Sequence, residues 1–288
     1  MQYRGEQGAI SVTRQFDHAI QPLPIYFVDA FASRLLTGNP AAVVPLQSWL
    51  ADELMQAIAS ENNLSETAFV VPDRANTFHI RWFSPATEVD FCGHATLAAA
   101  FALLNYQGQA SPLQFWAKAL GRFTVTELKD RRLEMNLPNM APEPVDEIPE
   151  ALITGISITP TQVLKNRQAY FVVLASEQDV RAVEVDLTRL QTLSPLDVVI
   201  TARGNAYDFV SRYFWPANGG TEDPVTGSIH TGLAPYWARE TGKSTLIALQ
   251  ASKRGGVLFC RVAGDRVFIS GHCAAYLQGL INIKTSAA

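Results

Sequence analysis

The chain has 288 residues, of which 48% are apolar and 17% are charged, and its formal net charge is -4. This composition is typical of a folded protein with a sizeable core, and it lacks the basic surface of a nucleic-acid-binding protein. We therefore do not expect nucleic acid as a partner. No stretch approaches the roughly 20 consecutive apolar residues that span a membrane, so we do not expect a membrane as a partner either.

Residues 1–22 are predicted to form a loosely ordered N-terminal extension. Charged residues are scattered through this segment, and it lacks the apolar region of a signal peptide. The fold is therefore expected to begin near Pro24. The three cysteines, Cys92, Cys260 and Cys273, are too few and too scattered for a disulfide framework, which favours a reducing, cytoplasmic setting.

β-branched and aromatic runs along the rest of the chain predict strands, which we place at 68–71, 78–83, 198–201 and 208–214. Segments 95–104 and 229–238, each preceded by a glycine, predict helices. The first of these is apolar on all sides, so it is expected to be buried.

The chain also repeats itself. Residues 81–86 (RWFSPA) recur as 212–217 (RYFWPA), an offset of 131, and 92–94 (CGH) falls against 226–228 (TGS), an offset of 134. Each half therefore predicts two strands, a proline-containing turn and a helix that follows a glycine. The simplest architecture is an α+β fold of two similar barrel-like β domains, each wrapping a central helix.

A proline-rich stretch, 138–149, predicts the linker between the two halves. We expect a first domain over 23–140 and a second over 141–288. The last strand of the chain is able to return to the first domain.

The two predicted helix starts form a candidate binding site. A helix start offers unpaired N–H groups and partial positive charge, and glycine allows a ligand to approach the backbone. If the halves face each other, both starts meet in one interdomain cleft suited to a small anionic metabolite. The polar residues beside them are the candidates, although such residues most often serve only as caps and turns: Cys92, His94, Asp223, Thr226 and Ser228.

Glu66 precedes an apolar strand. A carboxylate at this position, if desolvated, would suit general acid–base work. Position alone, however, favours a solvated glutamate at the end of a strand.

Several motifs in order resemble the phenazine-biosynthesis F (PhzF-like) family of isomerases, which are relatives of diaminopimelate epimerase. The resemblance covers about residues 24–284. It rests on these segments: 28–31, 38–41, 63–69, 83–85, 88–89, 92–96 and 222–228.

This resemblance implies a duplicated diaminopimelate epimerase-like fold, an active site between the domains, a homodimer and no cofactor. It implies that Glu66 moves the proton and that Gly93 and Gly227 receive the substrate carboxylate through their N–H groups. The remaining candidates for substrate binding or proton relay are Ser65, His94, Asp223, Thr226 and Ser228. The best-known activity of the family isomerises dihydro-hydroxyanthranilate, so the sequence predicts a cofactor-independent isomerase of a small carboxylate-bearing metabolite.

Diaminopimelate epimerases use two cysteines, one at each helix start. Cys92 matches the first, but the second half has no thiol there, so two-thiol chemistry is not expected and a packed, structural Cys92 is favoured. No metal is expected either, because Cys92, His94, His272 and Cys273 match no established zinc spacing. No dinucleotide-binding glycine motif follows a strand, and Gly255-Gly256 predicts a hairpin turn.

Two other functions stay open. An amino-acid racemase or epimerase would combine Glu66 with a second base, for which His94 or Asp223 could serve. A catalytically silent binding protein could keep the duplicated fold. The remaining histidines, including His79 and His230, are expected at the surface or in packing.

Overall fold

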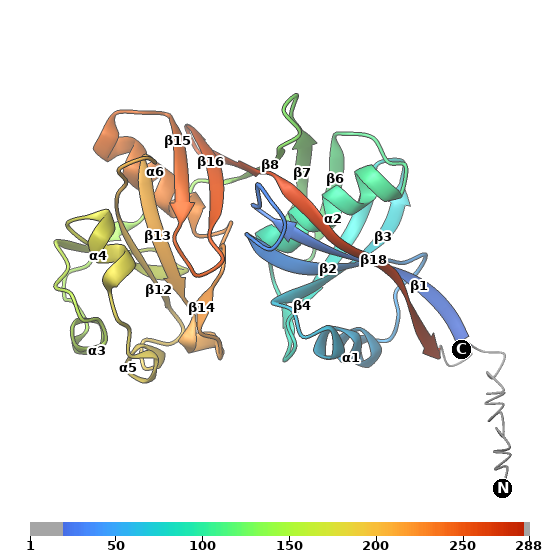
Figure 1. Ribbon diagram of the computed structural model, residues 1–288, viewed down its shortest axis with the longest axis horizontal. Helices are drawn as coiled ribbons and strands as arrows, with labels where there is room; N and C mark the ends of the chain where they lie inside the picture. The colour runs from blue at the N-terminus through green and yellow to red at the C-terminus, as the bar shows by residue number, and fades with distance from the viewer. Residues whose placement is uncertain (1–19, 285–288) are drawn as a thin grey trace, which may run out of the picture.

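The computed structural model describes residues 20–284, so most of the predicted extension 1–22 lies outside the described residues. The first strand, β1 (Ile20–Ala30), begins earlier than the expected start near Pro24. It does so because it pairs antiparallel along its length with the last strand, β18 (Cys273–Lys284). The last strand, β18, therefore lies on the first half of the molecule, as Figure 1 shows.

The first half wraps seven further strands around one helix. Its elements after β1 are β2 (Asn39–Pro45), α1 (Asp52–Asn62), β3 (Glu66–Arg74), β4 (Thr77–Phe83), β5 (Glu88–Val89), α2 (Gly93–Tyr106), β6 (Leu113–Ala117), β7 (Gly121–Glu127) and β8 (Leu133–Pro138). Helix α2 is the central one. Its alanines at 95, 98, 99, 100 and 102 are fully buried, because small side chains let the strands approach the helix closely on all sides.

The second half repeats this plan. Its elements are β9 (Glu143–Pro144), α3 (Glu150–Thr154), β10 (Gln162–Lys165), β11 (Ala169–Val173), α4 (Glu177–Ala182), α5 (Leu187–Gln191), β12 (Asp197–Arg203), β13 (Phe209–Phe214), the short 3-10 helix η1 (Pro216–Asn218), β14 (Glu222–Asp223), α6 (His230–Thr241), β15 (Thr245–Gln250), β16 (Gly256–Ala263) and β17 (Arg266–Gly271). The strand β9 lies inside the predicted linker 138–149 and already pairs with β10.

The pairing of the strands shows the duplication directly. In the first half β2 runs parallel to β3 and β4 parallel to β6, and in the second half β11 runs parallel to β12 and β13 parallel to β15. The connections between β4 and β6 and between β13 and β15 contain the central helices, α2 and α6. The connections between β2 and β3 and between β11 and β12 contain the outer helices, α1 in the first half and α4 and α5 in the second. The predicted α+β architecture of two similar barrels around central helices is thus the one observed.

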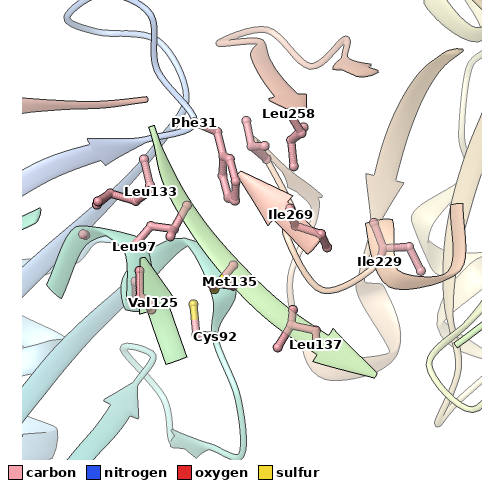
Figure 2. Packing of buried hydrophobic residues seen from close by; sticks show 14 of the residues in the cluster. Phe31, Cys92, Leu97, Val125, Leu133, Met135, Leu137, Ile229, Leu258 and Ile269 are labelled. Carbon is pink, nitrogen blue, oxygen red and sulfur yellow. The ribbon is translucent and has the colours of Figure 1, made fainter. Parts of the chain in front are cut away.

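The two halves meet where β8 pairs antiparallel with β17. Met135 of β8 faces Ile269 of β17 in this pairing, and these residues are separated by the same offset of 134 that separates Gly93 from Gly227. A pseudo-two-fold axis therefore passes through this pair. Figure 2 shows Met135 and Ile269 at the junction, and one continuous apolar core runs through it.

No helix among residues 20–284 is long and apolar enough to cross a membrane.

Candidate active site

The centre of the candidate site is a contact between Glu66 and His94. Glu66 is the first residue of β3, and His94 is the second residue of the central helix α2. Glu66 Oε2 lies 3.0 Å from His94 Nε2, and the two side chains are only 14% and 5% exposed. The contact lacks the alignment of a hydrogen bond, so Oε2 is buried without a hydrogen-bond donor among the described residues. A carboxylate oxygen in this state is free to accept a proton from a ligand.

Asn39, the first residue of β2, connects the two halves at this contact. Its Nδ2 lies 3.0 Å from His94 Nδ1 and donates to Asp223 Oδ1 at 2.8 Å and to the carbonyl of Val225 at 2.9 Å. Its Oδ1 accepts a hydrogen bond from Ser65 Oγ at 3.1 Å. Asn39 is fully buried, so one amide holds groups from both halves in a fixed arrangement.

Asp223 is the acidic group that the second half contributes. Its Oδ2 accepts a hydrogen bond from Thr226 Oγ1. Gln250 holds the same turn, because its Oε1 accepts from the Thr226 N–H at 2.8 Å and its Nε2 donates to the Asp223 carbonyl at 2.8 Å. Burial raises the pKa of Asp223, and the nearby carboxylate of Glu66 raises it further.

Opposing effects act on the pKa of His94. Burial lowers the pKa of its imidazole, whereas the carboxylates of Glu66 and Asp223 raise it, and the balance is upward. The candidate proton carrier Glu66 therefore lies beside a second titratable group. The arrangement has the parts of an acid–base site: a carboxylate base, an imidazole and a second carboxylate.

The two predicted helix starts do meet, but they differ. In α2 the first intrahelical hydrogen bond runs from Thr96 N to Cys92 O at 3.1 Å, which leaves the amides of residues 93–95 without a helical acceptor. The helix α6 begins only at His230, and Gly227 lies in a tight turn before it, with the His230 N–H donating to the Gly227 carbonyl. Ile229 is the N-cap residue of α6, so neither Thr226 nor Ser228 serves as a side-chain cap.

Gly93 and Gly227 lie against each other across the pseudo-two-fold axis. A Cβ atom at Gly93 would lie 3.5 Å from Gly227 Cα and 3.5 Å from the amide nitrogen of Ser228. The amide groups of both halves thus converge on one point beside the buried histidine. This convergence provides the N–H groups that an anion needs.

Ser228 is held by a chain of polar side chains in the second half. Gln168 Nε2 donates to Ser228 Oγ at 2.9 Å and to the Tyr213 hydroxyl at 3.1 Å, and Tyr213 donates to Asp197 Oδ2 at 2.6 Å. Burial and the Asp197 carboxylate raise the pKa of Tyr213 well above its usual range, so the phenol keeps its proton. Ser228 Oγ already accepts one hydrogen bond, and its own O–H is available for a ligand.

Cys92 is the N-cap residue of α2, with its Sγ 3.4 Å from His94 Nδ1. Burial and the neighbouring Glu66 carboxylate raise the pKa of this thiol well above its usual range, so it stays protonated at neutral pH. Glu66, Cys92 and His94 bring three possible metal-ligand atoms within 4.8 Å of one another. A metal ion bound there would have to displace the thiol proton, because the thiolate is the ligand.

A second interdomain contact holds the loop before Asn39. The guanidinium of Arg254, from the turn between β15 and β16, lies 2.8 Å from Asp29 Oδ1 and donates to the Gly38 carbonyl. Gly38 has φ +70°, and a Cβ there would lie 2.2 Å from the Ala30 carbonyl oxygen. Only glycine fits this position, and the turn it makes delivers Asn39 to the site.

Two hollows on the described surface lie elsewhere. One, of about 470 Å³, is lined by Trp49, Arg81 and Trp116, and the other, of about 290 Å³, by Gly155 and Asp186 among others. Neither includes Glu66 or His94. The polar cluster is instead enclosed at the junction of the halves.

The structure therefore places the predicted residues in two connected groups. In the first group Asn39 contacts Ser65, His94 and Asp223. Glu66 contacts His94, and Thr226 contacts Asp223. In the second group Gly93 adjoins Gly227 and Ser228. The sequence reasoning assigned no role to Asn39, Gln168 or Gln250. The only signal for Asn39 was its place in the Gly-Asn-Pro motif at 38–40.

Comparisons with known proteins agree with this picture. The family model for phenazine biosynthesis-like protein (PhzC-PhzF) matches residues 28–279. An uncharacterized isomerase of Pseudomonas aeruginosa is 48% identical over 261 residues, which cover 91% of this chain and 99% of that protein. A human phenazine biosynthesis-like domain-containing protein is 36% identical over 290 residues, which cover 90% of this chain and 99% of that protein.

Solved structures show the same similarity. A PhzF-family protein of Enterococcus faecalis superposes with a TM-score of 0.86 at 40% identity, covering 91% of this chain and 99% of that one. A hydroxyproline epimerase of Agrobacterium vitis superposes with a TM-score of 0.58 at 11% identity over 91% and 93% of the two chains, a likeness of fold alone.

Proposed function

The chain belongs to the phenazine biosynthesis-like (PhzC-PhzF) family and is an isomerase, and we propose that it shifts a proton within a small carboxylate-bearing metabolite without a cofactor. The proposed reaction is similar to the isomerisation of dihydro-hydroxyanthranilate. Glu66 is the proposed acid–base residue.

One observation carries the proposal: the carboxylate of Glu66 is enclosed beside His94 and keeps an oxygen that no well-aligned hydrogen-bond donor reaches among the described residues. A carboxylate held in this way accepts a proton from one carbon of the substrate and returns it to another. The low exposure of both side chains keeps bulk water from quenching the carbanion-like intermediate. Asp223, held by Asn39 and Thr226, is proposed to bind a polar substituent of the substrate.

The substrate carboxylate is proposed to bind where Gly93 adjoins Gly227. The amides at the start of α2, which have no helical acceptor, and the Ser228 hydroxyl are the proposed hydrogen-bond donors there. An anion at this position gains from the partial positive charge of the helix start. This geometry supports a substrate with a carboxylate close to the carbon that loses the proton.

A homodimer is proposed on the basis of β18. Among the described strands it pairs only with β1, which leaves its other edge unpaired. It also exposes large apolar side chains: Tyr276 (59%), Leu277 (43%) and Leu280 (65%). A long apolar edge strand of this kind favours pairing with a second copy. Light scattering on a size-exclusion column would measure the mass in solution.

The cysteines support the proposed reducing, cytoplasmic setting. Cys92, Cys260 and Cys273 are all free thiols, and none is paired with another. Free cysteines of this kind are usual in a reducing compartment.

The proposed function is tested by incubating the full chain in deuterium oxide with a panel of small unsaturated acids and amino acids. Mass spectrometry then shows which compound gains deuterium and whether it also changes structure. Labelling with isomerisation of an unsaturated acid supports the proposal. Labelling at the α-carbon of amino acids would favour a racemase, and binding without labelling would favour a silent binding protein.

A further inference from the structure

The orientation of the Asn39 side-chain amide is fixed by its surroundings. Nδ2 lies 2.9 Å from the carbonyl oxygen of Val225 and 2.8 Å from Oδ1 of Asp223, while Oδ1 accepts the hydroxyl proton of Ser65. A backbone carbonyl can only accept, so the NH₂ side of the amide must face it. A flipped amide would place its oxygen against two others in a fully buried site.

The same NH₂ group lies 3.0 Å from His94 Nδ1. The two hydrogens of Nδ2 already serve Asp223 and Val225, and an amide nitrogen does not accept a hydrogen bond, so a proton on His94 Nδ1 would face no acceptor there. The ring proton of a neutral His94 therefore sits on the opposite nitrogen, Nε2. That nitrogen lies 3.0 Å from Oε2 of Glu66.

We propose that Asn39 is a positioning residue that fixes His94 as the Nε2–H tautomer, so that the imidazole donates at Nε2 and Glu66 is the base of the pair. The tautomer follows from the contacts alone, whereas its part in the reaction rests on the proposed function. The substrate group that faces Nε2 is then a hydrogen-bond acceptor, such as a carbonyl or carboxylate oxygen.

Other groups around the His94 ring affect whether both of its nitrogens carry a proton. The carboxylates of Glu66 and Asp223 favour an imidazolium, while the start of α2, where His94 is the second residue, disfavours positive charge. The Cys92 sulfur lies 3.4 Å from Nδ1 and 3.8 Å from Nε2, so it does not select between the two nitrogens. Because Asn39 Nδ2 offers Nδ1 no acceptor, Nδ1 is the nitrogen that loses its proton when the ring becomes neutral.

The chain contains its own reference for the opposite tautomer. His230, at the start of α6, is fully buried, and its Nδ1 lies 2.8 Å from the carbonyl oxygen of Thr226. Since a carbonyl accepts, the proton of His230 sits on Nδ1. One protein thus holds two buried histidines with opposite tautomers, each near the start of the central helix of its half.

Long-range ¹H–¹⁵N correlation spectra of the ligand-free full chain, labelled at histidine nitrogens and recorded from pH 7 upwards until the His94 ring is neutral, test the proposal. Comparison with His94→Gln and His230→Gln assigns the two rings. We expect the Nδ1 signal of His94 at the position of an unprotonated nitrogen and the Nδ1 signal of His230 at that of a protonated one. A neutral His94 ring with its proton on Nδ1 would overturn the proposal.

Two variants then isolate Asn39. Asn39→Asp replaces the NH₂ by an acceptor, so the Nδ1 signal of His94 should move to the protonated position. Ser65→Ala removes only the donor to Asn39 Oδ1 and should leave the His94 signals in place. A Nε2–H tautomer that persists in folded Asn39→Asp would contradict the role of Asn39, and if this variant does not fold, the wild-type spectrum still decides.

These spectra require no substrate. The tautomer can therefore fail while deuterium labelling of a substrate succeeds, and the reverse also holds. The two proposals are separable by experiment.

Discussion

Oε2 of Glu66 lies 3.0 Å from Nε2 of His94, although β3 and α2 carry these residues at separate places in the first half. Both residues lie at the beginning of their elements, where the chain enters a strand or a helix. The second half closes over this pair with Asp223 and with the turn at Gly227. A proton-transfer site formed in this way exists only when the two halves are packed together.

Cys92 is expected to be dispensable for chemistry. Its thiol stays protonated, because burial and the Glu66 carboxylate raise its pKa. Cys92→Ser should therefore lose little labelling activity compared with the roughly 10²–10⁴-fold loss that removal of a general acid or base causes. Deuterium incorporation per minute into the labelled substrate measures this, and a loss in that larger range would make Cys92 a catalytic residue.

Gly93→Ala is expected to fold normally and bind substrate poorly. A Cβ there would meet Met135 Cε at 3.4 Å and the Ser228 nitrogen at 3.5 Å, which are ordinary contacts, but it would occupy the space beside the amide donors. The thermal midpoint should stay unchanged while KM rises.

Gly227→Ala provides the comparison for Gly93→Ala. Its Cβ would lie 3.1 Å from Phe31 Cζ, so the aromatic ring must move and the thermal midpoint should fall. If Gly93→Ala kept the wild-type KM, the proposed place of the substrate carboxylate would be wrong.

Removing Arg254 is expected to destabilise the junction. Asp29 is only 4% exposed and Arg254 32% exposed, and Arg254→Ala leaves the carboxylate buried without its cation. Loss of one partner of a buried pair costs about 3–5 kcal/mol, and the partial exposure of Arg254 reduces this to about 2–3 kcal/mol. Urea unfolding at pH 7 measures the change in the free energy of unfolding.

A double-mutant cycle checks the cause of that loss. Once Asp29→Asn has removed the buried charge, the further change Arg254→Ala should cost less than it does in the wild type. Equal costs in the two backgrounds would show that the ion pair does not stabilise this loop.

His230 should make stability fall in mild acid. Burial lowers its pKa from 6.5 to about 4, so between these values the unfolded chain binds a proton that the folded chain does not. The stabilisation is complete above pH 6.5 and is lost as the pH falls towards 4. Between pH 7 and pH 4.5 the loss from this group is about 2 kcal/mol.

His230→Gln, which does not titrate, is the matched control for this effect. Urea unfolding of both proteins at the two pH values should show a smaller decrease for the variant. An equal decrease would assign the acid sensitivity to other groups.

The repeat and the two central helices could be predicted because they are encoded locally. The all-round apolar run at 95–104 and the matching segments at offsets of 131 and 134 lead to α2 and to the duplicated topology, and the family and the isomerase class are confirmed. The start of β1 was missed because its pairing partner is β18, at the other end of the chain.

The interior of the site was less predictable. Asn39 contacts Asp223 and Val225, which lie 184 and 186 residues further along the chain, so no local pattern shows its role. The turn before α6 is held by Gln250, which accepts a hydrogen bond from the Thr226 amide and lies on a distant strand. The environment of Glu66 likewise depends on packing around His94 rather than on its position before a strand.

The central claim is that Glu66 carries the proton, and the most direct test compares wild type with Glu66→Gln in deuterium oxide on the panel compound that wild type labels. Glutamine keeps the size of the side chain and removes its ability to take a proton. We predict that the rate of deuterium incorporation and of isomerisation falls by roughly 10²-fold or more while the compound still binds. Labelling by Glu66→Gln at the wild-type rate would contradict the claim.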